Sequence, residues 1–335
     1  AWDIVKLASN ENPNGASPSV IRKIQDVASS ASIYPDDSFF ELKSALAKYY
    51  ETQNDNIIIG AGSDQILEFV SHAVLNKDET VLMNNVTFAM YEIYAKVTGA
   101  KIVKTDSIHH DLDQFYTLYE EHKPKLIFIC TPNNPTGDAL KYDDLFNFLD
   151  KIDEETLVVV DGAYMEYAKA KDSAYYVTPK MLMERYNNVL YAGTFSKAYG
   201  LGGMRVGYGI GGSEMIKALH KLRPPFNITT LSLAAAIEAL KDQSFVADCI
   251  STNYEQMVQY EEFAEELGLE TIPSFTNFIT LILKEHNSKE VAQTLLEQGI
   301  IIRDISGYGV NAIRITIGRA TQNERVIAAL RKTLV

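Results

Sequence analysis

The chain has 335 residues, a length that suggests one large and one small domain rather than a single core. Its formal net charge of −13 argues against nucleic acid or an anionic membrane surface as a partner, because both bind basic footprints. Only two cysteines are present, and no Cys/His array accompanies them, so we expect no metal site and a reducing, cytoplasmic location. No stretch approaches the roughly 18 consecutive apolar residues that a membrane helix needs.

Short β-rich runs alternate with helical stretches through the middle of the chain. Strands are expected at 57–59, 81–83, 125–130, 157–160, 189–192 and 206–210, and helices at 65–75, 88–98 and 142–150. Apolar runs of this kind are typical of strands buried on both faces of a mainly parallel sheet. This βαβ rhythm predicts a large α/β domain over residues 34–244.

The pattern changes after about residue 245. A long helix is expected at 245–267, followed by a strand at 278–283, a helix at 289–298, strands at 300–302 and 312–317, and a final helix at 323–334. This arrangement predicts a smaller α+β domain. We expect it to be formed by residues 245–335 together with residues 1–33.

The strongest chemical signal lies in residues 193–208, just after an expected strand. The hydroxyls of Thr194 and Ser196 and the guanidinium of Arg205 can bind phosphate oxygens, while the glycines let the backbone approach a ligand. A partly desolvated Lys197 can form a Schiff base with an aldehyde. A lone Ser-Lys pair would usually be an exposed loop, but the whole segment favours a cofactor site.

A carboxylate follows the apolar run 158–160. Asp161 stands at the carboxyl end of this expected strand, where open α/β sheets bind ligands. It can pair with a protonated pyridine nitrogen, and Tyr164 could reach a phenolic oxygen of the same ring. The alternative for Asp161 alone is a helix N-cap.

Two loops complete the candidate site. In residues 130–137, two prolines stiffen a loop that presents the amide of Asn134, although a triplet of this kind is often an ordinary turn. In residues 60–65, a glycine turn opens a helix. The backbone N–H groups of Ser63 and Asp64 could hold a phosphate there.

The order of these four segments resembles that of fold-type-I pyridoxal-phosphate (PLP) enzymes of the aspartate-aminotransferase-like class. Within this class the chain is most similar to histidinol-phosphate aminotransferases, over nearly its whole length. The narrower resemblance is carried by residues 7–13 (Leu-Ala-Ser-Asn-Glu-Asn-Pro), 299–304 and 313–318. It implies the PLP-dependent transferase fold, with a large, mainly parallel α/β domain and a smaller α+β domain, and PLP as cofactor.

The resemblance also implies roles for single residues. Lys197 would bind the cofactor aldehyde and shuttle a proton. Asp161 would face the pyridine nitrogen, and Asn134 and Tyr164 would bond the phenolic oxygen. Phe88 would stack on the ring, since two flat conjugated systems attract each other when offset; without the resemblance, core packing is an equal alternative for Phe88.

Anionic groups would be bound at two places. The cofactor phosphate would be held by Ser63, Asp64, Thr194, Ser196 and Arg205. Tyr34 would reach that phosphate from the partner subunit of a homodimer with shared active sites. Arg314, helped by Arg303, would bind the anionic end of the substrate through forked hydrogen bonds.

The activity implied is transamination between histidinol phosphate and 2-oxoglutarate, in histidine biosynthesis. Two alternatives with the same fold stay open: an aminotransferase for aromatic or other amino acids, and a PLP-dependent decarboxylase of the threonine-phosphate type. A regulator without catalysis would be expected to carry a DNA-binding extension, and a plain nucleotide-binding protein a GxGxxG or Walker loop; neither is seen in the sequence.

Three positions depart from the family pattern. Gly162 and Gln65 stand where relatives often carry an acid, and Asn14 stands where an aromatic or apolar residue is common. The pattern of residues 165–190 assigns them no functional role.

Overall fold

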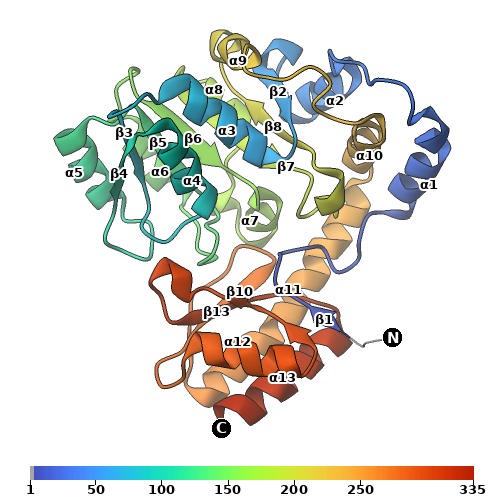
Figure 1. Ribbon diagram of the computed structural model, residues 1–335, viewed down its shortest axis with the longest axis vertical. Helices are drawn as coiled ribbons and strands as arrows, with labels where there is room; N and C mark the ends of the chain where they lie inside the picture. The colour runs from blue at the N-terminus through green and yellow to red at the C-terminus, as the bar shows by residue number, and fades with distance from the viewer. Residues whose placement is uncertain (1–3) are drawn as a thin grey trace.

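The computed structural model describes residues 4–335 and divides them between a large and a small domain (Figure 1). The large domain is built on a seven-stranded sheet and the small domain on a four-stranded sheet. A single long helix, α11 (Gln243–Leu267), leaves the large domain and runs along the small one.

The large sheet contains every strand expected between residues 57 and 210. Its order is β2 (Ile57–Gly60), β8 (Gly207–Ile210), β7 (Val189–Thr194), β6 (Leu157–Asp161), β5 (Leu126–Cys130), β3 (Thr80–Met83) and β4 (Lys101–Lys104). All pairs are parallel except the two made by β8, which is antiparallel to β2 and β7. The edge strand β4 was not expected from the sequence, because it is short and has lysines at both ends, as edge strands often do.

Helices cover both faces of this sheet, and alternate strand residues feed two apolar cores. Ile58 joins the core beneath α3 (Ser63–Val74), α4 (Ala89–Thr98) and α9 (Ser213–His220). Ile57 and Ile59 point to the opposite core, as the period of two in a strand requires. That second core lies beneath α2 (Phe40–Tyr50), α5 (Leu112–His122), α6 (Tyr142–Leu149), α7 (Met165–Lys171), α8 (Pro179–Met183) and α10 (Thr230–Lys241).

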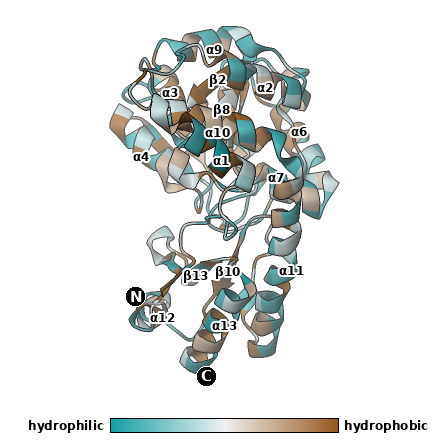
Figure 2. Ribbon diagram, turned by 90° about the vertical axis from the view of Figure 1, so that its right-hand side faces the viewer, coloured by the Kyte–Doolittle hydropathy of each residue, from teal (hydrophilic) through white to brown (hydrophobic). Residues whose placement is uncertain are grey.

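The small domain has its own apolar core beneath an antiparallel sheet. The strands follow the order β12 (Arg303–Asp304), β13 (Ala312–Thr316), β10 (Phe278–Ile282) and β9 (Glu270–Thr271). Besides α11, the helices α12 (Ser288–Glu297) and α13 (Ala320–Leu334) contribute buried side chains to this core. Figure 2 shows apolar strands inside and polar faces on the surrounding helices. Within residues 4–335, no helix is long and apolar enough to cross a membrane.

The N-terminal segment is divided between the two domains. Strand β1 (Val5–Lys6) pairs with β11 (Ile300–Ile301) in the small domain. Helix α1 (Pro18–Val27) instead packs on α10 and buries Val20 in a core of the large domain. The sequence led us to expect that the whole segment 1–33 packs against the small domain. Residues 1–3 of this segment lie outside the described chain. The difference arises because the apolar face of α1 is covered by a large-domain helix.

Candidate active site

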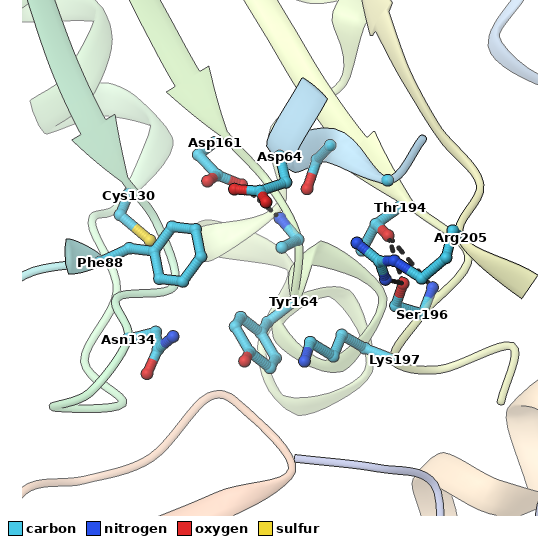
Figure 3. Close-up of a pocket in the computed structure, with 13 residues that line it drawn as sticks. Asp64, Phe88, Cys130, Asn134, Asp161, Tyr164, Thr194, Ser196, Lys197 and Arg205 are labelled. Carbon is cyan, nitrogen blue, oxygen red and sulfur yellow. Dashed lines mark hydrogen bonds between the residues drawn. The ribbon is translucent and has the colours of Figure 1, made fainter. Parts of the chain in front are cut away.

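A pocket that is partly open to solvent lies at the carboxyl ends of β5, β6 and β7 (Figure 3). It is lined by Gly62, Ser63, Asp64, Phe88, Cys130, Asn134, Asp161, Ala163, Tyr164, Thr194, Ser196, Lys197 and Arg205. The structure therefore brings ten of the thirteen predicted site residues into one pocket; Tyr34, Arg303 and Arg314 are the exceptions.

Strand register explains why residues so distant in sequence meet. Cys130 pairs with Asp161 across β5 and β6, and Asp161 pairs with Ala192 across β6 and β7. Parallel strands end at the same edge of a sheet, so the residues that follow them converge there. Helix α3 begins at Ser63, with two residues between it and strand β2, which is separated from β7 by β8, and turns its N-terminus toward the same edge.

Lys197 lies over a tyrosine ring and close enough to two arginines to feel their positive charges. Its Nζ lies 3.4 Å from the carbonyl oxygen of Ser9, to which it donates, and 5.7 Å from the centre of the Tyr164 ring. Burial, together with the positive charges of Arg314 and Arg205, lowers the pKa of Lys197 to about 8. About a tenth of the amine is thus neutral at pH 7, far more than for an ordinary lysine, and this form can act as a nucleophile.

Asp161 is a buried carboxylate with only neutral hydrogen-bond partners. Its Oδ2 accepts from the hydroxyl of Tyr91 at 2.7 Å, and its Oδ1 accepts from the backbone N–H of Ala163 at 3.1 Å. Burial raises the pKa of Asp161 above its usual value. A buried carboxylate gains most from a cationic partner, so this position suits the protonated nitrogen of a ring.

The donors on the other side of the cavity form an anion-binding cradle. No side chain in the described chain caps the N-terminus of α3, which leaves its first N–H groups free for a ligand. The guanidinium of Arg205 lies against the same turn: a Cβ at Gly62 would come within 2.5 Å of its Nη2. Arg205 also donates to Ser196 Oγ at 3.3 Å, and Ser196 Oγ accepts from Thr194 Oγ1 at 3.0 Å.

The side chain of Asp64 agrees with a role for its backbone alone in binding phosphate, which stays a prediction. One oxygen of its side chain, Oδ1, is buried with no hydrogen-bond partner among residues 4–335. Burial raises the pKa of this carboxyl group. A negative side chain would repel a phosphate, whereas the N–H of the same residue belongs to the free helix end.

The wall facing the small domain joins three parts of the chain. Arg314 on β13 donates through Nη1 to Asn134 Oδ1 and through Nη2 to the carbonyl oxygen of Ala8 at 2.8 Å. Asn10 donates through Nδ2 to the hydroxyl of Tyr164 at 2.7 Å. Arg314 is buried, and its Nε has no hydrogen-bond partner among the described residues.

Of the three predicted residues that do not line the pocket, Arg314 bonds to the lining residue Asn134, whereas Arg303 and Tyr34 lie apart from it. Arg303 is exposed and pairs in register with Arg314 across β12 and β13; it lines a neighbouring hollow that Phe88 also borders. Tyr34 is 79% exposed and stacks on Phe226, with ring centres 4.6 Å apart. Its predicted contact therefore requires the active site of a second chain.

Two site contacts were not foreseen from the sequence. Tyr91 bonds to Asp161, and Asn10 bonds to Tyr164. Tyr91 lies in the first turn of α4, three residues after Phe88, and this closeness in sequence to a predicted site residue could have identified it. The role of Asn10 depends on the N-terminal segment crossing to the large domain, which no local pattern reveals.

Known proteins share both the sequence and the fold. Residues 2–330 match the family model for aminotransferase class I and II. A histidinol-phosphate aminotransferase of Aliarcobacter butzleri is 57% identical, covering 99% of this chain and 91% of its own length. One from Wolinella succinogenes is 53% identical, with 99% and 91% covered.

Solved structures agree with this relationship. The histidinol-phosphate aminotransferase of Sinorhizobium meliloti, in complex with pyridoxal-5'-phosphate, superposes with a TM-score of 0.93 at 27% identity, covering 99% of this chain and 90% of that one. An L-threonine-O-3-phosphate decarboxylase of Porphyromonas gingivalis reaches 0.83 at 23% identity, with 99% of each chain covered, and shows the fold alone. The chain belongs to the class I and II aminotransferases and, among them, to the histidinol-phosphate aminotransferase family.

Proposed function

We propose that this chain transfers an amino group between histidinol phosphate and 2-oxoglutarate, with pyridoxal phosphate as cofactor, in histidine biosynthesis. The observation that carries the proposal is the meeting of three groups in one pocket. These are the low-pKa amine of Lys197, the buried carboxylate of Asp161 and the anion cradle around Arg205. Relatives that are 53–57% identical over nearly the whole chain support the choice of substrate.

The residues of the pocket match the groups of the cofactor one by one. When bound, pyridoxal phosphate supplies an aldehyde and a ring that withdraws electrons from the substrate. The phosphate would lie in the cradle, held by the N–H groups of Ser63 and Asp64 and by Thr194, Ser196 and Arg205. Asp161 would pair with the ring nitrogen, the Asn134 amide and Tyr164 hydroxyl would bond the phenolic oxygen, and Phe88 would cover one face of the ring.

Lys197 is the group that holds and moves the proton. Because its pKa is lowered to about 8, its Nζ is neutral far more often than that of an ordinary lysine, and the neutral form can accept a proton from the substrate Cα. Its position over the Tyr164 ring restricts where Nζ can move. The same nitrogen can then return the proton at a neighbouring carbon, as a general acid.

The substrate end of the pocket is cationic. Arg314 keeps an unpaired Nε, and strand pairing places Arg303 beside it. The fork of a guanidinium group matches the geometry of both phosphate and carboxylate, so it can form two parallel hydrogen bonds to either anion. This dual capacity suits a reaction in which one amino donor carries a phosphate and the other, glutamate, carries two carboxylates.

We further propose that the chain acts as a homodimer in the cytoplasm, with Tyr34 completing the phosphate site of the partner subunit. Tyr34 is largely exposed in its own chain and lies beside another exposed aromatic residue, Phe226. Ile33 and Phe40 near it in sequence are also exposed, at 66% and 63%. Exposed apolar side chains gathered in one region are typical of interaction surfaces.

A coupled assay tests the proposed reaction. Histidinol phosphate, phenylalanine, tyrosine and threonine phosphate are offered as amino compounds with 2-oxoglutarate as acceptor, and glutamate and carbon dioxide are both measured. We expect kcat/KM to be highest for histidinol phosphate, with no carbon dioxide released. A preference for an aromatic amino acid would reassign the substrate, and carbon dioxide released from threonine phosphate without glutamate would reassign the reaction.

A further inference from the structure

A forked ion pair joins the loop after α9 to the segment before α2. Arg223 donates through Nη1 to Asp37 Oδ1 at 2.8 Å and through Nη2 to Oδ2 at 3.0 Å, and Nη2 also reaches the Asp37 carbonyl oxygen at 3.0 Å. Only 10% of the Arg223 side chain is exposed, and its guanidinium lies 4.8 Å from the centre of the Phe39 ring. These hydrogen bonds lower the pKa of Asp37, so the pair is charged at neutral pH.

The same carboxylate also orients Phe226. The backbone N–H of Phe226 donates to Asp37 Oδ1 at 2.7 Å. Phe226 has a φ of +56°, a left-handed conformation that bulky residues rarely adopt unless their surroundings impose it. Its ring then stacks on Tyr34 at 4.6 Å with an angle of 28° between the planes. Because Tyr34 is 79% exposed, burial does not fix its orientation, and its stacking on Phe226 orients it instead.

The next residue of the loop points inward, to the phosphate-binding turn of its own chain. Asn227 donates through Nδ2 to Gln65 Oε1 at 2.7 Å and to the carbonyl oxygen of Ile59 at 3.3 Å. Gln65 Oε1 also accepts from the backbone N–H of Ala61 at 2.8 Å, inside the turn that leads into α3. Arg223 Nη1 also donates to Asn227 Oδ1 at 3.0 Å. One guanidinium therefore contacts both Asp37, which orients Phe226, and Asn227, which contacts the phosphate-binding turn.

We propose that the loop 223–227 positions the phosphate contacts of two different active sites. Through Asp37 and Phe226 it orients Tyr34 for the site of the partner subunit. Through Asn227 and Gln65 it holds the Gly60–Asp64 turn of its own site. Arg223 and Asn227 are thus positioning residues, and the proposal rests on the homodimer and the cofactor given under the proposed function.

The chemistry of Arg223 suits its two-sided role. A planar guanidinium with five fixed donors can bond both carboxylate oxygens, the Asp37 carbonyl and Asn227 at once. A lysine ammonium keeps the charge but cannot reproduce this fork. Arg223→Lys therefore removes the geometry while preserving the ion pair, and Asp37→Asn removes the charge while preserving the shape.

Hybrid dimers, purified with two different affinity tags, separate the two branches. A chain with Lys197→Ala cannot bind PLP covalently. Borohydride reduction after a PLP titration therefore reports only the site with an intact Lys197. In the trans hybrid, one chain carries Arg223→Lys with Lys197→Ala and the other is unaltered. In the cis hybrid, one chain carries Arg223→Lys alone and the other carries Lys197→Ala alone.

We expect the PLP concentration for half-saturation to rise about tenfold in the trans hybrid, because the intact site receives Tyr34 from the altered chain. In the cis hybrid it should rise less than threefold. Asn227→Ala should give the reverse pattern, with the larger rise in the cis hybrid. If the Arg223→Lys defect stays with the site of its own chain, or if both variants act on the same site, the proposal is wrong.

Two controls keep this result distinct from failure of the proposed function. A dimer of an unaltered chain and a Lys197→Ala chain should fix one PLP per dimer; no fixation would contradict the role of Lys197 instead. Sedimentation of the unaltered protein as a monomer would contradict the dimer, and the inference with it. If Arg223→Lys does not assemble, Asp37→Asn replaces it in both hybrids, with the same outcomes expected.

Discussion

At the scale of single residues, the active site is governed by the charges around Lys197. Two guanidinium groups, those of Arg314 and Arg205, act with burial to favour the neutral amine. Each has a second task, since Arg205 borders the anion cradle and Arg314 holds Asn134. The cations that would bind the anionic groups of cofactor and substrate are thus the same ones that prepare the amine for reaction.

This arrangement predicts how cofactor capture depends on pH. Only neutral Lys197 attacks the aldehyde, so the rate at which the apoenzyme captures PLP should rise with pH to a midpoint near 8. Removing a nearby cation stabilises the ammonium form and raises its pKa. Arg314→Gln should therefore shift the midpoint to higher pH, while Arg314→Lys, which keeps a positive charge, should shift it less.

Stopped-flow absorbance of the three proteins measures these midpoints. The pH range should run from about 6, below the expected midpoint, to about 10.5, the pKa of an ordinary lysine. Ionisation of PLP itself is common to all three proteins, so the difference between midpoints isolates Lys197. Equal midpoints for Arg314→Gln and the unaltered protein would show that Arg314 has no influence on the amine.

At the scale of secondary-structure elements, the residue directly after the central strand β6 is a glycine because there is no room for a side chain there. A Cβ at Gly162 would lie 2.4 Å from the hydroxyl oxygen of Tyr191 and 2.6 Å from the ring carbon that carries it. Tyr191 is buried on the adjacent strand β7 and cannot turn away. The absence of an acid at position 162, which departs from the family pattern, is therefore matched to a large side chain on the neighbouring strand.

Gly162→Ala should destabilise the protein by about 1–3 kcal/mol, the usual cost of overpacking a core. Gly203→Ala is the matched control, because nothing lies within 4 Å of a Cβ there, and it should be nearly neutral. Urea unfolding of the apoproteins measures both. Combining Gly162→Ala with Tyr191→Leu should cost less than the sum of the two changes, since they occupy the same space; additive losses would refute the steric explanation.

The elements also show what a sequence can and cannot reveal. Strands such as β5 and β6 are continuous apolar runs, so their place in a buried parallel sheet follows from composition, and with it the position of Asp161. The segment 165–190 resisted assignment because it forms short helices, α7 and α8, separated by an irregular stretch. Local periodicity is weak in such pieces, and long-range contacts decide their conformation.

The placement of the N-terminal segment shows the same limit for the site. Asn10 and Ser9 approach Tyr164 and Lys197, and α1 packs on α10, although the sequence placed this segment with the small domain. These contacts span more than 150 residues. Only packing of the whole chain determines them.

At the scale of the whole molecule, the large domain lines the pocket, and Arg314 of the small domain borders it. The small domain contributes Arg314, and hydrogen bonds tie it to the large domain, including Thr280 Oγ1 to the Pro135 carbonyl oxygen at 2.6 Å. Tyr34 remains outside, on a region of exposed apolar side chains. Association of two chains would both cover this region and bring Tyr34 to a phosphate.

This reasoning predicts that dimerisation and cofactor affinity are lost together. Ile33→Asp combined with Phe40→Asp places two charges on the exposed apolar region, and burying unpaired charges at an interface is costly. We expect sedimentation velocity to show monomers, and the PLP concentration for half-saturation to rise at least tenfold. Val97→Asp, at an equally exposed apolar position (69%) on α4, is the matched control and should leave both unchanged. A monomer that binds PLP as tightly as the unaltered protein would show that each chain completes its own phosphate site.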